Sequence, residues 1–170
     1  MKEQPDLCFI QETKCIIDRM KTISKKQCSK YKMLVVEGKQ MAGGILTLWN
    51  PQVMNILAAE ATGHTLSVNM KIIGNMEVIL CTNVYGPQMV EEKRRMLLEL
   101  ENLRSRSNNL EWILARDFNI ITTVAKKKGG TGRLDRDAKD FSSFIDIVEM
   151  VDIKTSNGQF TWNNKWINQH

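Results

Sequence analysis

Apolar residues follow two patterns along the chain, one typical of strands and one typical of helices. Short apolar runs bounded by glycine, proline or polar residues predict strands. The predicted strands are residues 7–10, 33–36, 44–49, 65–73, 76–85 and 111–115. In three other segments the apolar residues recur with the period of an amphipathic helix. The predicted helices are residues 16–23, 91–106 and 141–148.

Two neighbouring strands indicate how the sheets are built. Gly74 and Asn75 form a turn signal between residues 65–73 and residues 76–85, which predicts a hairpin. The centre of the second strand, residues 78–81, is apolar on both faces, as expected for a strand between two packed layers. Strands outnumber helices and one strand pairs with the next, so we predict an α/β fold with mixed or antiparallel sheets covered by helices.

The composition is that of an ordinary globular domain. The 170 residues are 42% hydrophobic and 25% charged, which is enough apolar material for a core. No apolar run approaches the ~20 residues that span a bilayer, so we expect no membrane segment. The four cysteines, Cys8, Cys15, Cys28 and Cys81, form no closely spaced pair that would bind zinc. Cys8 and Cys81 lie in apolar runs, so we expect buried, unreactive thiols and an intracellular location.

Basic residues are concentrated in two segments. The chain has 24 Lys and Arg against 19 Asp and Glu, a net charge of +5 that permits an anionic partner. Residues 19–39 hold seven basic residues and one acidic residue, and residues 126–136 hold five and one. Solvated surface and phosphate contacts along a nucleic acid both explain such segments.

Polar side chains stand at the carboxyl ends of three predicted strands. These are Glu12, Tyr85, and the pair Asp117 and Asn119. In layered α/β proteins this edge is a common place for ligand sites. Asp117 and Asn119 are two residues apart, so in an extended segment both side chains point to one face while Phe118 points back to the core.

These residue types suit phosphate chemistry. The carboxylate of Glu12 is a hard oxygen ligand for Mg²⁺, and the hydroxyl of Tyr85 can donate to an oxyanion. Asp117 can orient or deprotonate water, and the amide of Asn119 can donate to a phosphate oxygen. Each residue taken alone is also explained as a solvated carboxylate, an Asx turn or a rigid Tyr-Gly-Pro turn. A metal-dependent phosphoesterase and ordinary loop chemistry therefore both remain open.

The ordered set of motifs around these residues resembles the endonuclease/exonuclease/phosphatase superfamily, which has the DNase-I-like fold. More closely, it resembles the apurinic-type endonuclease domain of plant LINE (non-LTR) retrotransposons. The segments that carry the resemblance are 11–14 (QETK), 43–49 (GGILTLW), 83–87 (NVYGP), 117–119 (DFN), 128–130 (KGG), 141–146 (FSSFID), 151–153 (VDI) and 158–164 (GQFTWNN). The match runs from about Pro5 to Trp166, in family order.

The resemblance implies a fold and an activity. The fold would be a four-layer α/β sandwich of two packed mixed sheets flanked by helices, incomplete here, with residues 1–170 forming one partial domain. The activity would be hydrolysis of a DNA phosphodiester with Mg²⁺ or Mn²⁺ and no small-molecule cofactor. Other implied features are a reverse-transcriptase domain in the parent polyprotein and a nuclear location.

The resemblance also assigns roles to residues. Glu12 would hold the metal, and Tyr85 would contact the scissile phosphate. Asp117 would orient or activate the nucleophile, and Asn119 would help to bind the phosphate. The residues expected to contact nucleic acid are Lys126, Lys127, Lys128 and Arg133.

Three departures from the family change the expected activity. By this resemblance the family's first strand, which carries a Trp-Asn motif, would come before residue 1. Its Arg-Leu-Asp and Ser-Asp-His segments would come after residue 170, and His170 does not occupy the catalytic position. Arg116 stands where the family has glycine before Asp-Phe-Asn. We therefore expect an inactive or weak endonuclease that is marginally stable alone. The alternatives are a non-catalytic nucleic-acid-binding module and an exonuclease or phosphatase of the same superfamily.

Overall fold

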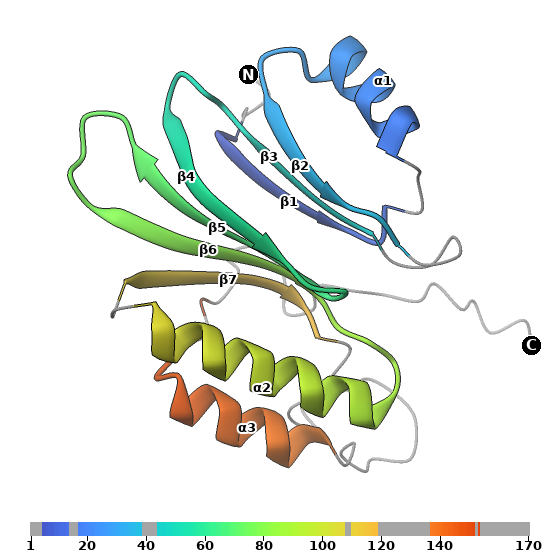
Figure 1. Cartoon of the computed structure of the whole chain (residues 1–170), viewed down its shortest axis with the longest axis vertical. Helices are drawn as coiled ribbons and strands as arrows, with labels where there is room; N and C mark the ends of the chain where they lie inside the picture. Colours follow the sequence, from blue (N-terminus) through green and yellow to red (C-terminus); the bar gives the residue numbers. More distant parts are fainter. Residues whose placement is uncertain are drawn as a thin grey trace, which may run out of the picture. The chain divides into compact units, whose positions relative to one another are not determined.

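Figure 1 shows the computed structural model of the chain, coloured along the sequence. The structure describes residues 5–13, 17–38, 44–107, 110–118, 137–151 and 153. The chain falls into two compact units, residues 1–119 and residues 120–170. That residues 1–170 form one partial domain stays a prediction.

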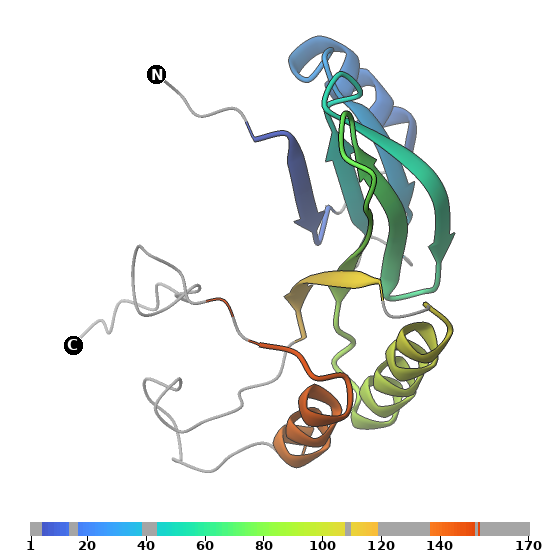
Figure 2. The same ribbon diagram turned by 90° about the vertical axis from the view of Figure 1, so that its left-hand side faces the viewer.

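The first sheet has three antiparallel strands. They are β1 (Leu7–Gln11), β3 (Ile45–Trp49) and β2 (Lys32–Val36), in the spatial order β1-β3-β2. Leu7 lies opposite Trp49, and Gln11 lies opposite Ile45. Every residue of β3 is buried, because this strand is central and covered on both faces. Figure 2 shows β1 at the edge of this sheet.

The outer face of the first sheet is covered by helix α1 (Ile17–Gln27). Met20 is 7% exposed and packs with Leu46 and Leu48 of β3. Partly buried side chains surround this cluster, namely Cys8, Cys28, Tyr31, Met33 and Val35. Met20 thus lies on the sheet as the amphipathic spacing predicts, whereas Ile23 of the same predicted stripe is 40% exposed, so the predicted apolar face is buried only in part.

The second sheet is mixed. Its strands are β4 (Met54–Ala61), β5 (Thr65–Ile72), β6 (Val78–Tyr85) and β7 (Glu111–Asp117), in sequence order. The first three are antiparallel neighbours, and β6 pairs with β7 in parallel. The predicted hairpin joins β5 to β6, with Gly74 at φ +88°, where glycine is favoured.

Helix α2 (Val90–Arg106) covers the outer face of the second sheet (Figure 1). Its buried apolar side chains are Met96, Leu97, Leu100 and Leu103. Acidic residues stand in its first turn and basic residues in its last turn, an arrangement that complements the helix dipole. The side chain of Arg104 donates to the carbonyl oxygen of Leu110 at 2.8 Å, which fixes the helix to the start of β7.

The inner faces of the two sheets meet in one core. Trp49 from the first sheet clusters with Met54, Val68, Met70 and Cys81 from the second. Side chains of β1 and β2, Leu7, Phe9 and Leu34, pack against this cluster. The first unit therefore has the layers α1, sheet, sheet and α2, and the predicted four-layer α/β sandwich is confirmed.

The second unit contains helix α3 (Asp137–Ile147). Phe141 and Phe144 are 3% and 1% exposed, and their ring centroids lie 6.0 Å apart. The helix predicted from these phenylalanines is confirmed. None of the helices within the described ranges is long and apolar enough to cross a membrane.

The three described cysteines differ in burial. Cys81 is fully buried, as predicted. Cys8 is only partly buried, as is Cys28, so the prediction of a buried Cys8 is wrong. The reason is that β1 is an edge strand, so Cys8 packs at the margin of the Met20, Leu46 and Leu48 cluster and has no neighbouring strand on one side.

Candidate functional site

Three strands of the first unit end on the same side of the sandwich. In Figure 1 the arrows of β1, β6 and β7 all point to the right. Glu12 follows β1, Tyr85 ends β6 and Asp117 ends β7. Three side chains from distant parts of the sequence thus stand at one edge.

The ends of β6 and β7 are held side by side. The two strands are parallel, and Tyr85 is the register partner of Asp117. The backbone N–H of Gly86 donates to the carbonyl oxygen of Asp117 at 2.6 Å. Phe118 is 2% exposed, so it turns back to the core as predicted, while Asp117 is exposed to solvent.

Gly86 is needed because another segment crosses it closely. A Cβ atom added at Gly86 would clash with the backbone of Phe118, 2.7 Å from its Cα atom. Only a residue without a side chain lets the segment after β7 lie against the end of β6. The contact between Gly86 and the backbone of Asp117 and Phe118 therefore keeps Asp117 next to Tyr85.

A partly buried hydrogen bond joins the end of β1 to β6. The side chain of Gln11 donates to Oδ1 of Asn83 at 2.6 Å. Asn83 is fully buried, and its Nδ2 donates to the carbonyl oxygen of Leu46 at 3.0 Å. Gln11 precedes Glu12, and Asn83 stands two residues before Tyr85. The two sheets are therefore tied together directly beneath the edge that carries the candidate residues.

Gln11 and Asn83 lie in the motif segments 11–14 and 83–87, but no role was predicted for either side chain. The available signal was a carboxamide in an otherwise apolar part of a strand, since buried amides need hydrogen-bond partners. The pairing itself joins residues 72 positions apart, so it was not visible in the sequence.

The backbone turns sharply after β1. Glu12 has φ +53°, in the left-handed region that side chains seldom adopt. The N–H of Thr13 donates to the carbonyl oxygen of Gly44 at 3.3 Å. Gly44 also has a positive φ, and a Cβ atom there would meet the hydroxyl of Thr13. Residues held in sparsely populated conformations cluster at functional sites, and here the conformation leaves Glu12 exposed.

The residues at this edge offer hard oxygen ligands. Among the described residues no three or more His, Cys, Asp and Glu side chains gather as a metal cluster. Mg²⁺ commonly uses one or two carboxylates and keeps several waters. The carboxylates of Glu12 and Asp117 fit that donor chemistry, and no softer ligand is needed.

The other predicted site residues lie outside the described residues. These are Asn119, Lys126, Lys127, Lys128 and Arg133, and the side chain of Arg116 is not described either. The roles assigned to Glu12, Tyr85 and Asp117 stay predictions.

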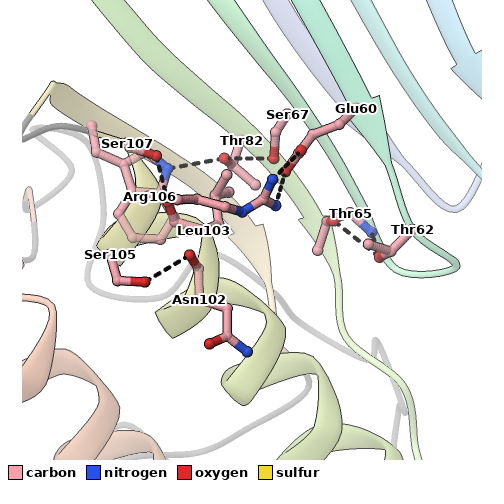
Figure 3. Close-up of polar contacts among 11 residues, drawn as sticks. Glu60, Thr62, Thr65, Ser67, Thr82, Asn102, Leu103, Ser105, Arg106 and Ser107 are labelled. Atoms are coloured by element: carbon pink, nitrogen blue, oxygen red, sulfur yellow. Dashed lines mark hydrogen bonds and ion pairs between the residues drawn. The ribbon is translucent and has the colours of Figure 1, made fainter.

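A second polar cluster lies between α2 and the outer face of the second sheet (Figure 3). Arg106 donates to both carboxylate oxygens of Glu60 at 2.6 and 2.8 Å. The indole N–H of Trp112 donates to the hydroxyl of Thr82 at 2.9 Å, and that hydroxyl contacts Ser67 at 3.0 Å. A small hollow of about 160 Å³ borders Glu60 and Arg106. Because these polar groups satisfy one another, we interpret the cluster as a structural contact.

No family model and no curated protein matches this chain. Solved structures of endonuclease/exonuclease/phosphatase proteins do match it. The Xenopus laevis APE2 catalytic domain matches with a TM-score of 0.63 and 15% identity over 83% of this chain and 58% of that chain. An endonuclease/exonuclease/phosphatase protein from Bacteroides vulgatus matches with a TM-score of 0.59 and 13% identity, over 82% of this chain and 56% of that chain. D. rerio TDP2 in complex with a single-strand DNA product matches with a TM-score of 0.51 and 16% identity, over 69% of this chain and 49% of that chain.

These similarities establish the fold. Two sheets of three and four strands between helices, in this topology, make the DNase-I-like sandwich that the matched structures share. The chain spans about half the length of the solved structures that it matches.

Proposed function

We propose that this chain is part of a Mg²⁺- or Mn²⁺-dependent DNA endonuclease of the LINE type, weak or inactive on its own. The observation that supports the proposal is the placement of Glu12, Tyr85 and Asp117 at one edge of a DNase-I-like sandwich. The fold is shared with nucleases and phosphatases. The motif resemblance selects the LINE-type nuclease among them.

The chemistry follows from the residue types. A bound divalent metal supplies charge neutralisation at the phosphoryl oxygens. Glu12 would hold that metal through its exposed carboxylate. The hydroxyl of Tyr85 would donate to the scissile phosphate, and the carboxylate of Asp117 would orient the attacking water. Asn119 would add an amide donor to the phosphate.

The DNA substrate and the partners belong to the same proposal. D. rerio TDP2 is a structural neighbour in complex with single-strand DNA. The basic segment that contains Lys126, Lys127, Lys128 and Arg133 would contact the phosphate backbone. The parent protein would also carry a reverse-transcriptase domain and act in the nucleus.

Nicking of a supercoiled plasmid tests the proposal. We expect slow, Mg²⁺-dependent nicking that is lost in Glu12→Gln and in Asp117→Asn. Glu111→Gln is the matched control, because Glu111 is an exposed carboxylate at the opposite end of β7. The assignment of the chemistry to this edge is wrong if the purified chain nicks the plasmid and the nicking persists in both site variants.

An exposed basic surface favours a second candidate function, a non-catalytic nucleic-acid-binding module. We call it the α1–β2 basic surface; its exposed cations are Arg19, Lys21, Lys26, Lys30 and Lys32. Lys30 also lies over the ring of Tyr31. Binding of a labelled duplex should weaken about 10³-fold or more between about 50 and 200 mM salt if six or more phosphates are contacted. Lys26→Glu with Lys30→Glu should weaken this binding, and Glu12→Ala should not.

A further inference from the structure

Two cysteines that are far apart in the sequence share one site on the outer face of the first sheet. Cys8 lies on β1, and Cys28 directly follows α1. We propose that Cys8 and Cys28 form a reversible disulfide that fastens the C-terminal end of α1 to β1. This proposal is independent of the nuclease proposal.

Both thiols pack against the same apolar cluster. Met20, Leu46 and Leu48 form its buried centre, with Cys8 and Cys28 among the partly buried side chains around it. In the strand register Cys8 lies opposite Leu48, so its side chain lies beside the residue on which α1 rests. Cys28, the residue after the last residue of α1, packs against the same cluster.

Two hydrogen bonds hold the turn after α1 beside the start of β1. The N–H of Tyr31 donates to the carbonyl oxygen of Cys28 at 2.9 Å, which closes the turn. The hydroxyl of Tyr31 donates to the carbonyl oxygen of Pro5 at 2.6 Å, three residues before Cys8. The position of Cys28 relative to β1 is therefore fixed by named contacts, not only by general packing.

The electrostatics of Cys8 agree with this proximity. Burial raises the pKa of the Cys8 thiol, and negative charge on Cys28 raises it further, whereas Lys30 lowers it. Cys28 and Lys30 influence Cys8 in this way only because both are near it. Both thiols are also partly exposed, so a small oxidant in solvent can reach them.

The third described cysteine offers an internal control. Cys81 is 0% exposed and donates its S–H to the sulfur of Met70 at 3.1 Å. Burial raises the pKa of Cys81 to about 12, which keeps it a neutral thiol. Because the thiolate is the reactive form, Cys81 should stay reduced where Cys8 and Cys28 react.

The oxidation balances with a peroxide as the two-electron oxidant. One thiolate sulfur attacks the peroxide, the O–O bond breaks, and the sulfur becomes a sulfenic acid while the departing hydroxide takes up the proton that the thiol had lost, giving one water. The thiol of the second cysteine then displaces the hydroxyl, forming the S–S bond and releasing a second water. A dithiol reductant reverses the step by thiol–disulfide exchange.

The bond would act on a helix with little buried surface. Of the α1 side chains that the structure describes, Met20 alone is buried. Few buried contacts allow local opening. A link between Cys8 and Cys28 would close a loop that includes Glu12 and all of α1, and so restrict that opening. It would also steady the α1–β2 basic surface.

Peptide mapping of the full chain tests the inference. The protein is treated with hydrogen peroxide, alkylated, digested and analysed by mass spectrometry with and without dithiothreitol. We expect a Cys8–Cys28 linked peptide that the reductant removes, with Cys81 alkylated only after unfolding. Amide exchange across residues 17–27 should slow at least several-fold in the oxidised protein.

Other outcomes would overturn the inference. Independent oxidation of Cys8 and Cys28 to sulfinic acids, a bond from either to Cys15, or a bond between two chains would each contradict it. Slowed exchange in α1 that persists in Cys28→Ser under peroxide would also contradict it. The mapping uses the unmodified sequence, so it decides the question even if the serine variant does not fold.

Discussion

Gln11 and Asn83 join the two sheets of the sandwich through one side-chain hydrogen bond of 2.6 Å. The bond lies just below the edge where Glu12, Tyr85 and Asp117 stand. Asn83 uses its other end to donate to the backbone of β3 at Leu46. One buried amide thus sets the position of the end of β1 relative to the end of β6.

Replacing Asn83 by leucine should be strongly destabilising. The change leaves the buried carbonyl oxygen of Leu46 and the partly buried amide of Gln11 without Asn83 as a partner, and a buried group without its partner costs about 1–3 kcal/mol. Equilibrium urea unfolding measures the loss. The matched control is Asn55→Leu, an exposed position on β4, which should change the free energy of unfolding by less than about 0.5 kcal/mol. Equal losses in the free energy of unfolding at the two positions would show that the Gln11–Asn83 hydrogen bond does not stabilise the fold.

Gly86→Ala should disturb the contact between the ends of β6 and β7. The added methyl group meets the backbone of Phe118, which cannot move aside as a flexible side chain would. Overpacking of this kind costs typically about 1–3 kcal/mol, and thermal unfolding measures it. Gly63→Ala is the control, since nothing lies within 4 Å of a Cβ atom there. A stability of Gly86→Ala equal to that of the control would mean that the two segments separate easily.

The strands and helices were largely readable from the sequence, with one exception. The predicted strands and helices match observed elements, because each has a clear apolar run or a clear helical stripe. Strand β4 (Met54–Ala61) was not predicted. It is rich in alanine, which is depleted in strands, and a bulge between Ile56 and Ala58 interrupts its alternation.

The candidate site was only partly readable for a different reason. The motifs located Glu12, Tyr85 and Asp117, since each follows a recognisable strand. The contacts that hold them together were not predicted, because a hydrogen bond across 72 positions and a glycine under a crossing backbone leave no local pattern. The same reason hid the proximity of Cys8 and Cys28, whose spacing in sequence suggests no pair.

Leu100 and Leu98 test how α2 is held on the second sheet. Leu100 is 1% exposed and Leu98 is 58% exposed on the same helix. Leu100→Ala should lower the free energy of unfolding by about 2–5 kcal/mol, through lost burial and the cavity that is left. Leu98→Ala should be within about 0.5 kcal/mol of the parent, because alanine is also the better helix former. Similar losses for both variants in urea unfolding would contradict the orientation of α2.

Cys81 should make stability fall in alkaline solution. Its pKa is raised by burial from 9.0 to about 12. Below pH 9 both the native and the unfolded chain keep the proton, so the full stability is present there. As the pH rises above 9 the unfolded chain loses the proton while the native chain retains it, and the free energy of unfolding decreases by up to about 1.4 kcal/mol per pH unit until the native thiol ionises near 12.

The comparison with Cys81→Ala isolates this effect from the other groups that titrate at high pH. The alanine variant loses some packing, so it should be less stable than the parent at pH 8. Its stability should decline less steeply between pH 9 and pH 10.5, because it lacks the thiol whose ionisation favours the unfolded chain. Urea unfolding at several pH values measures the two slopes. Parallel slopes for the two proteins would show that the Cys81 thiol ionises as readily in the folded chain as in the unfolded one, against its position in the core between the sheets.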